Sequence, residues 1–89
     1  MKQVLIAGLI AVSSVAHAED ISVAAGRCGA FHLVRNNLDK AQLAANHAEN
    51  KGKMQVAANR WLELAKTNPK EAVAQAQMSC IYTLRIDAN

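Results

Sequence analysis

Three residues of this sequence have side chain types and a spacing that could do chemistry together: Cys28, His32 and Cys80. The two cysteines are the only ones in the chain, and His32 follows Cys28 by one helical turn. Two thiols and an imidazole are ligands of zinc, but a structural zinc site has four ligands and no fourth is evident. A redox-active pair would be spaced Cys-x-x-Cys, much closer than these two. We therefore predict a structural disulfide between Cys28 and Cys80, with no metal and no cofactor.

No other grouping of residues predicts catalysis. Ser22 and Ser79, the serines beyond residue 18, do not lie in a nucleophile elbow. The carboxylates are scattered and lack the pairing that acid–base hydrolysis needs. His32 and His47 stand fifteen residues apart on one predicted helix, about 22 Å at 1.5 Å per residue, so they cannot share a metal ion, and we expect both to be partly exposed. The sequence predicts a protein that is not an enzyme.

The first eighteen residues have the pattern of a secretory signal peptide. Lys2 supplies a positive charge, residues 4–15 are mainly apolar, and Ala16-His17-Ala18 is the small-x-small pattern that signal peptidase cleaves. The apolar run is about a dozen residues long, whereas a membrane-spanning helix needs about twenty. We expect cleavage after Ala18, a periplasmic or secreted protein, and no membrane span in its mature form.

Residues 19–89 then form one small domain of 71 residues (89 − 18). A domain of this size buries only about 60% of the surface of its unfolded chain. Its abundant alanine favours helix but contributes little core volume. A disulfide that closes a loop of some fifty residues adds about 4 kcal/mol in the chain-entropy model. Because the net stability of a small domain is only about 5 kcal/mol, we expect this bond to decide whether the domain folds.

Helical periodicity predicts a long first helix that begins with Ser22 as its N-cap and ends near Asn50. Residues spaced three or four apart predict its buried face. These residues are Cys28, Phe31, Val34, Leu38, Ala41, Ala45 and Ala48. The Asn50-Lys51-Gly52-Lys53 segment has residues typical of a helix C-terminus and predicts a break.

Two shorter helices are predicted after this break, over residues 54–66 and 69–86. Asn68 and Pro69 are a strong start signal, because asparagine caps and proline suits the first helical position. The last helix is expected to bury Val73, Ala76, Cys80, Ile81 and Leu84, and residues 87–89 are expected to fray. The predicted fold is all-α: a small three-helix bundle, with a long first helix packed by two shorter ones and stapled by one disulfide.

Gly52, Ala57, Trp61 and Pro69 are spaced as in the second helix and terminal turn of a tetratricopeptide repeat. The segment resembles that family over about 34 residues. The large residues of the first repeat helix are replaced by Ala41, Ala44, Ala45 and Ala48, and no second copy of the repeat follows. The resemblance therefore indicates a helical hairpin and no peptide-binding repeat array.

Net charge and the single tryptophan bear on what the protein could bind, although the basic residues in the middle of the chain also suit a solvated surface. Without Lys2 the chain has nine basic and seven acidic residues, a net charge of +2, which is too small and too mixed for nucleic acid. Trp61, the only tryptophan, is either a core residue or an exposed anchor for a partner. Its helical stripe favours the core. We name Trp61, Arg60, Lys53 and Lys51 as candidate partner-binding residues.

Size, export signal and the absence of catalytic motifs favour a small exported, non-enzymatic protein-interaction module. Inhibitors, immunity or exclusion factors and chaperones are of this type, and the partner is an unidentified protein. The alternative is a structural or assembly subunit of a bacterial envelope machine or surface filament. In that case the alanine-rich faces would pack against further copies of the chain.

Overall fold

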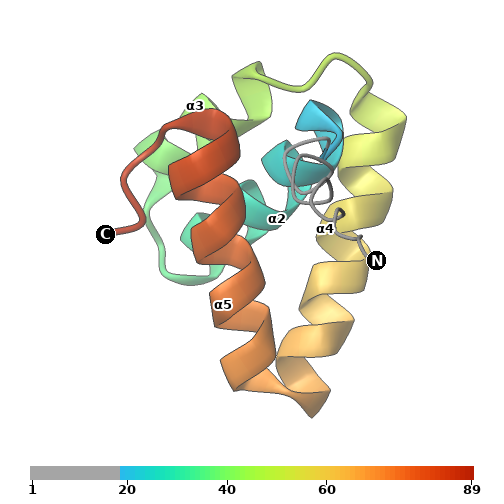
Figure 1. Cartoon of the computed structure of the whole chain (residues 1–89), viewed down its shortest axis with the longest axis vertical. Helices are drawn as coiled ribbons and strands as arrows, with labels where there is room; N and C mark the ends of the chain where they lie inside the picture. Colours follow the sequence, from blue (N-terminus) through green and yellow to red (C-terminus); the bar gives the residue numbers. More distant parts are fainter. Residues whose placement is uncertain (1–18) are drawn as a thin grey trace, which may run out of the picture.

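The structure is a computed structural model that describes residues 19–89 (Figure 1). In this range it has four α-helices followed by a π-helical segment that continues the last of them. They are α2 (Ile21–Val34), α3 (Leu38–Asn46), α4 (Lys51–Thr67), α5 (Pro69–Met78) and η1 (Ser79–Leu84). No strand occurs among these residues, so the predicted all-α class is confirmed. The predicted signal peptide, residues 1–18, lies outside the described residues, and no helix between residues 19 and 89 has the length and apolar character to cross a membrane.

The predicted disulfide is confirmed. It joins Cys28 of α2 to Cys80 of η1, whose Cα atoms lie 5.1 Å apart, and both cysteines are fully buried. Alanine is the commonest residue of the surrounding core, and Phe31, Trp61, Leu84 and Ile86 are its large members. The bond therefore ties the first and last described helical elements together inside a core of small side chains.

The predicted long first helix is wrong, because the chain turns after α2 and begins a second helix, α3. Asn36 has a left-handed backbone with φ of 60°. Its N–H donates to the Leu33 carbonyl at 3.0 Å, and the N–H of Asn37 donates to the His32 carbonyl at 2.8 Å. This pair of bonds is a Schellman motif, with asparagine in the place that glycine usually takes. Asn37 then caps α3 with its side chain, so the bundle has four helices rather than three.

The turn moves the second half of the predicted stripe away from the core. Cys28 and Phe31 are buried as predicted, but Val34 and Leu38 are each 60% exposed. The predicted alanines of α3 and the segment after it are only partly buried, and Ala44 fills the core position of this helix. A change of helix direction resets which residues face inward.

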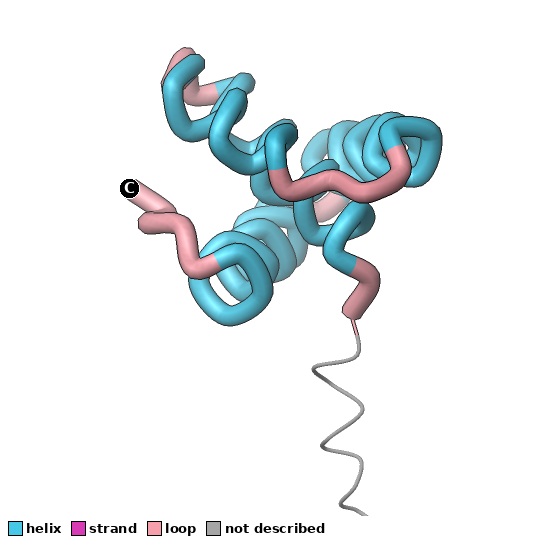
Figure 2. Tube along the Cα trace, turned by 90° about the horizontal axis from the view of Figure 1, so that it is seen from above, coloured by secondary structure: helices cyan, strands magenta, loops and turns pink. Residues whose placement is uncertain are grey.

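Helix α2 is the centre of the fold, and α3, α4, α5 and η1 all pack against it (Figures 1 and 2). Gly26 permits the close approach of α4. A Cβ atom at this position would lie 2.4 Å from the Met54 carbonyl oxygen and 2.8 Å from the Ala57 Cβ. The helical hairpin expected from the repeat-like segment is not formed, because α3 and α4 pack against α2 rather than extensively against each other.

Polar side chains begin the helices, though not always those expected. Asn68 caps α5 ahead of Pro69, as predicted. Asn50 caps the start of α4 rather than the end of the preceding helix. Asp20, not Ser22, caps α2. The buried Ser22 hydroxyl instead accepts hydrogen bonds from the N–H groups of Glu49 and Asn50, which fixes the α3–α4 connection against the start of α2.

The predicted start of the last helix is confirmed, but only part of its predicted buried face is. Its inward stripe advances in steps of four through Ala72, Ala76, Cys80 and Leu84. Val73 and Ile81 lie beside this stripe and are exposed, contrary to the prediction. The helix widens into η1 at Ser79 and ends at Leu84, and its C-cap residue Arg85 has a φ of 60°.

The prediction that the C-terminal tail frays is wrong, because the tail packs against the core. Ile86 and Ala88 are buried, and the N–H of Ile86 donates to the Cys80 carbonyl at 2.8 Å. The tail thus covers the end of the core beside the disulfide.

Candidate functional site

A groove of about 670 Å³ opens between α2, α4 and α5, and we call it the cationic groove. Its floor is apolar and is formed by Val23, Val56, Ala57, Trp61 and Leu64. Its charged lining residues are Asp20, Arg27, Lys53 and Arg60, and Asn50, Gly52 and Gln75 complete it. Three cations against one carboxylate give this lining a net charge of +2. The groove can therefore accept apolar side chains together with negative charge.

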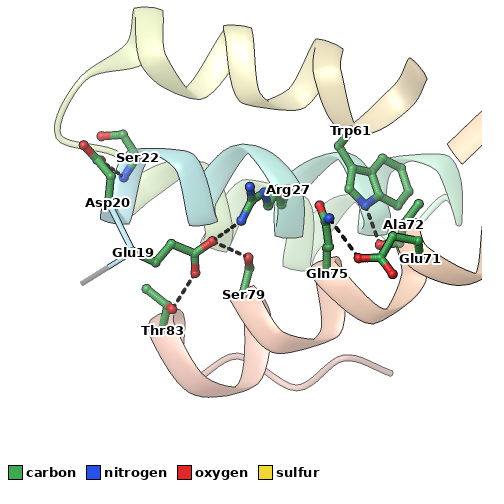
Figure 3. Close-up of polar contacts among 10 residues, drawn as sticks. All are labelled: Glu19, Asp20, Ser22, Arg27, Trp61, Glu71, Ala72, Gln75, Ser79 and Thr83. Atoms are coloured by element: carbon green, nitrogen blue, oxygen red, sulfur yellow. Dashed lines mark hydrogen bonds and ion pairs between the residues drawn. The ribbon is translucent and has the colours of Figure 1, made fainter. Parts of the chain in front are cut away.

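Trp61 anchors the floor of the cationic groove and is only 4% exposed, as its helical stripe predicted. Its indole Nε1 donates to the Ala72 carbonyl on α5 at 2.6 Å (Figure 3). The Phe31 ring meets it edge-on, with 6.2 Å between ring centroids. These contacts lock α4 against α5 and α2, so the groove has a rigid base. A role of Trp61 in partner binding stays a prediction.

The three cations of the groove differ in what they already contact. Arg27 pairs with Glu19, and Lys53 pairs with Asp20 at 3.0 Å. The hydrogen bond from Lys53 and a second one from the Ser22 N–H hold the pKa of Asp20 below its usual value. Arg60 is exposed and makes no ion pair within residues 19–89. It is the cation most available to a partner.

Glu19 fixes Arg27 in the groove wall. Its carboxylate accepts hydrogen bonds from the Ser79 hydroxyl at 2.9 Å and the Thr83 hydroxyl at 2.7 Å, besides the contact with Arg27 (Figure 3). The side chain of Glu19 is only 17% exposed. This cluster ties the start of α2 to η1 and limits the motion of the guanidinium.

The structure brings together three of the four predicted partner-binding residues. Trp61, Arg60 and Lys53 all line the cationic groove. Lys51 does not, because its Nζ turns away to donate to the Ala45 carbonyl at 3.1 Å.

The sequence analysis did not predict the groove as a whole, because its residues come from more than one helix. Lys53, Ala57, Arg60 and Leu64 are spaced four, three and four apart, so their common face on α4 was visible in the sequence. Arg27 joins them from α2, and no local pattern predicts that meeting.

His32 is fully buried, so the expectation of partial exposure is wrong. Its Nε2 lies 3.0 Å from the Asp87 carbonyl oxygen, and its Nδ1 has no hydrogen-bond partner among the described residues. Burial lowers the pKa of the imidazole, and the bond to Asp87 opposes this only in part. The cause is the tail after η1, which folds over the end of α2.

The chain matches no protein-family model, no curated protein and no solved structure. Its function is therefore inferred from the geometry of the described residues.

Proposed function

We propose that this protein is a small exported, non-enzymatic interaction module that binds a protein partner through the cationic groove. The observation that carries the proposal is the groove itself, an apolar floor bordered by three cations and one carboxylate. A segment that alternates acidic and apolar side chains has the complementary chemistry. An inhibitor, an immunity factor or a chaperone would use such a site to hold one segment of its client.

The two parts of the groove have separate roles in this proposal. The half-exposed Val56, together with Val23 and Leu64, offers apolar surface that a partner would remove from water. Rim cations such as Arg60 and Lys53 select and steer an acidic segment, although exposed ion pairs add little affinity. We expect apolar anchors to supply most of the affinity and the cations to supply the selectivity.

Export is part of the proposal and is supported by the buried disulfide between Cys28 and Cys80. Such bonds persist in oxidising compartments and are rare in the reducing cytosol. Among residues 19–89 the groove lining holds a single carboxylate and no serine, cysteine or histidine, which favours binding over catalysis.

A peptide library displayed on phage tests the proposal directly. The purified protein should select peptides rich in Asp or Glu beside apolar residues. Arg60→Glu reverses the unpaired cation of the groove, and the selected peptides should bind it about tenfold more weakly, a loss of about 1.4 kcal/mol. Lys70→Glu is the matched control, because Lys70 is also exposed but lies outside the groove. Selected peptides without acidic enrichment, or equal loss in both variants, would contradict the proposal.

The assembly alternative has an observation of its own. A second groove of about 300 Å³ lies between α2, α3 and α4, and none of the residues 19–89 that line it is charged. Leu33 and Val34 line it and are each more than half exposed. One face thus offers both apolar projections and a hollow, which suits a second copy of the chain related by a two-fold axis. Light scattering over a concentration series tests this: growth in mass that Leu33→Asp abolishes supports assembly, and a constant monomer mass excludes it.

A further inference from the structure

The buried imidazole of His32 has an arrangement that the disulfide does not require. Its Nε2 lies 3.0 Å from the Asp87 carbonyl oxygen, which can only accept, so this nitrogen carries the proton. Nδ1 is then unprotonated and carries a lone pair, and it is buried without a hydrogen-bond partner among the described residues. A ring nitrogen of His32 and the sulfurs of Cys28 and Cys80 all lie within 4.8 Å of one another. Two sulfurs and an imidazole with one unprotonated ring nitrogen therefore lie close together in the buried core.

This is the arrangement of a histidine prepared to bind a metal ion. Metal-binding histidines almost always donate their other ring N–H to a carboxylate, a backbone carbonyl or water, which fixes the tautomer. Asp87 supplies such a carbonyl. Cys80 also lies in a π-helical segment, a rare conformation that is frequent at functional sites.

We propose that the dithiol form of this protein binds one Zn²⁺ through Cys28, Cys80 and His32. A dithiol reductant delivers two electrons and two protons to the disulfide, so that the S–S bond breaks, two thiols form and the reductant becomes a disulfide. Zn²⁺ then displaces both thiol protons, and the imidazole lone pair binds without releasing a proton. The metal closes the same link between α2 and η1 that the disulfide closed.

Charge and ligand type favour zinc at this place. Two thiolates cancel the charge of Zn²⁺, so the site is neutral, and a neutral group is far less costly to bury than an ion. Two cysteines and one histidine are a ligand set that zinc accepts, with the fourth position left to water or another small ligand. Cys28 and His32 lie on α2 and Cys80 lies on η1, with the two cysteine Cα atoms 5.1 Å apart, so the packing of these two elements already brings the three ligand side chains together.

Cobalt binding to the reduced protein tests the inference, because Co²⁺ takes zinc sites and its thiolate complexes absorb light. The purified protein is reduced with a phosphine, desalted without oxygen and titrated with Co²⁺. We expect one equivalent to bind with thiolate-to-cobalt absorption, and Zn²⁺ to abolish that absorption. The oxidised protein should show none. No thiolate absorption in the reduced wild type would overturn the proposal.

Two measurements then separate His32 from the cysteines. His32→Gln should weaken Co²⁺ binding about tenfold or more, whereas His47→Gln, which alters a histidine outside this cluster, should leave it unchanged. If His32→Gln fails to fold, nitrogen NMR of the reduced wild type decides. Zn²⁺ should shift Nδ1 of His32 and leave His47 unchanged, and an unshifted His32 ring would overturn its place in the site.

Discussion

Removing the disulfide should take away most of the net stability of this protein. Cys28 and Cys80 are 52 residues apart, so their bond closes most of the described chain into one loop. In the chain-entropy model a loop of this length stabilises the folded state by about 4 kcal/mol. That figure is close to the whole net stability, about 5 kcal/mol, of a small domain.

The size of the effect can be converted to a melting temperature. For a domain of 60–100 residues, 1 kcal/mol shifts Tm by about 4–8 °C, so loss of the bond should lower Tm by about 16–32 °C. The variant Cys28→Ala/Cys80→Ala is compared with the oxidised wild type by circular dichroism during heating. Wild type that is reduced in the presence of a chelator should melt near the temperature of the variant.

The control and the contradicting result are equally direct. Met78→Ala removes an exposed side chain just before η1 and should change Tm by little. The loop model predicts that Tm drops by at least about 16 °C in the double variant. If the double variant instead melts within about 5 °C of the oxidised wild type, the alanine core holds the helices together without the bond. The reasoning about the staple would then be refuted.

Three further predictions follow from single contacts. Gly26→Ala should lower the free energy of unfolding by about 1–3 kcal/mol or more in denaturant titrations, because its Cβ would strike α4 backbone. Gly29→Ala, where a Cβ finds ordinary contacts, should cost nothing, and equal losses would contradict this account. Trp61→Phe removes the hydrogen bond from the indole to the Ala72 carbonyl and should cost about 0.5–1.5 kcal/mol by the same assay, whereas no loss would show that this bond does not stabilise the fold. Because the pKa of His32 is lowered in the folded protein, the unfolded chain binds more protons below about pH 6.5. The free energy of unfolding should therefore fall as the pH falls through this range, and it should fall less steeply in His32→Gln. Identical slopes in the two proteins would exclude His32 as the cause.

The features that could be predicted from the sequence are those set by neighbouring residues or by the number of cysteines. Two distant cysteines after a predicted export signal predict a bridge, and Asn68-Pro69 predicts a helix start, and both the bridge and the helix start are present. Helical spacing alone predicted that Trp61 faces the core, and it does. Each of these depends on residues that are close in the sequence or on a count.

The features that were missed depend on backbone conformation or on distant contacts. Asn36 takes a left-handed conformation that ends α2, and a periodic alanine-rich pattern continues across it without a visible break. His32 is buried by a tail that comes from the other end of the chain. The cationic groove needs Arg27 from α2 beside Arg60 from α4, and the close crossing of these helices at Gly26 is a contact between residues far apart in the sequence.

The central claim is that the cationic groove holds an acidic and apolar segment of a partner, and NMR of the labelled protein tests it most directly. Titration with an acidic peptide selected from the library should shift the backbone amides of Val56, Arg60 and Leu64, which line the groove. Leu33 and Val34, on the uncharged groove between α2, α3 and α4, should not respond. Shifts centred on those two residues, or no shifts at saturating peptide, would contradict the claim.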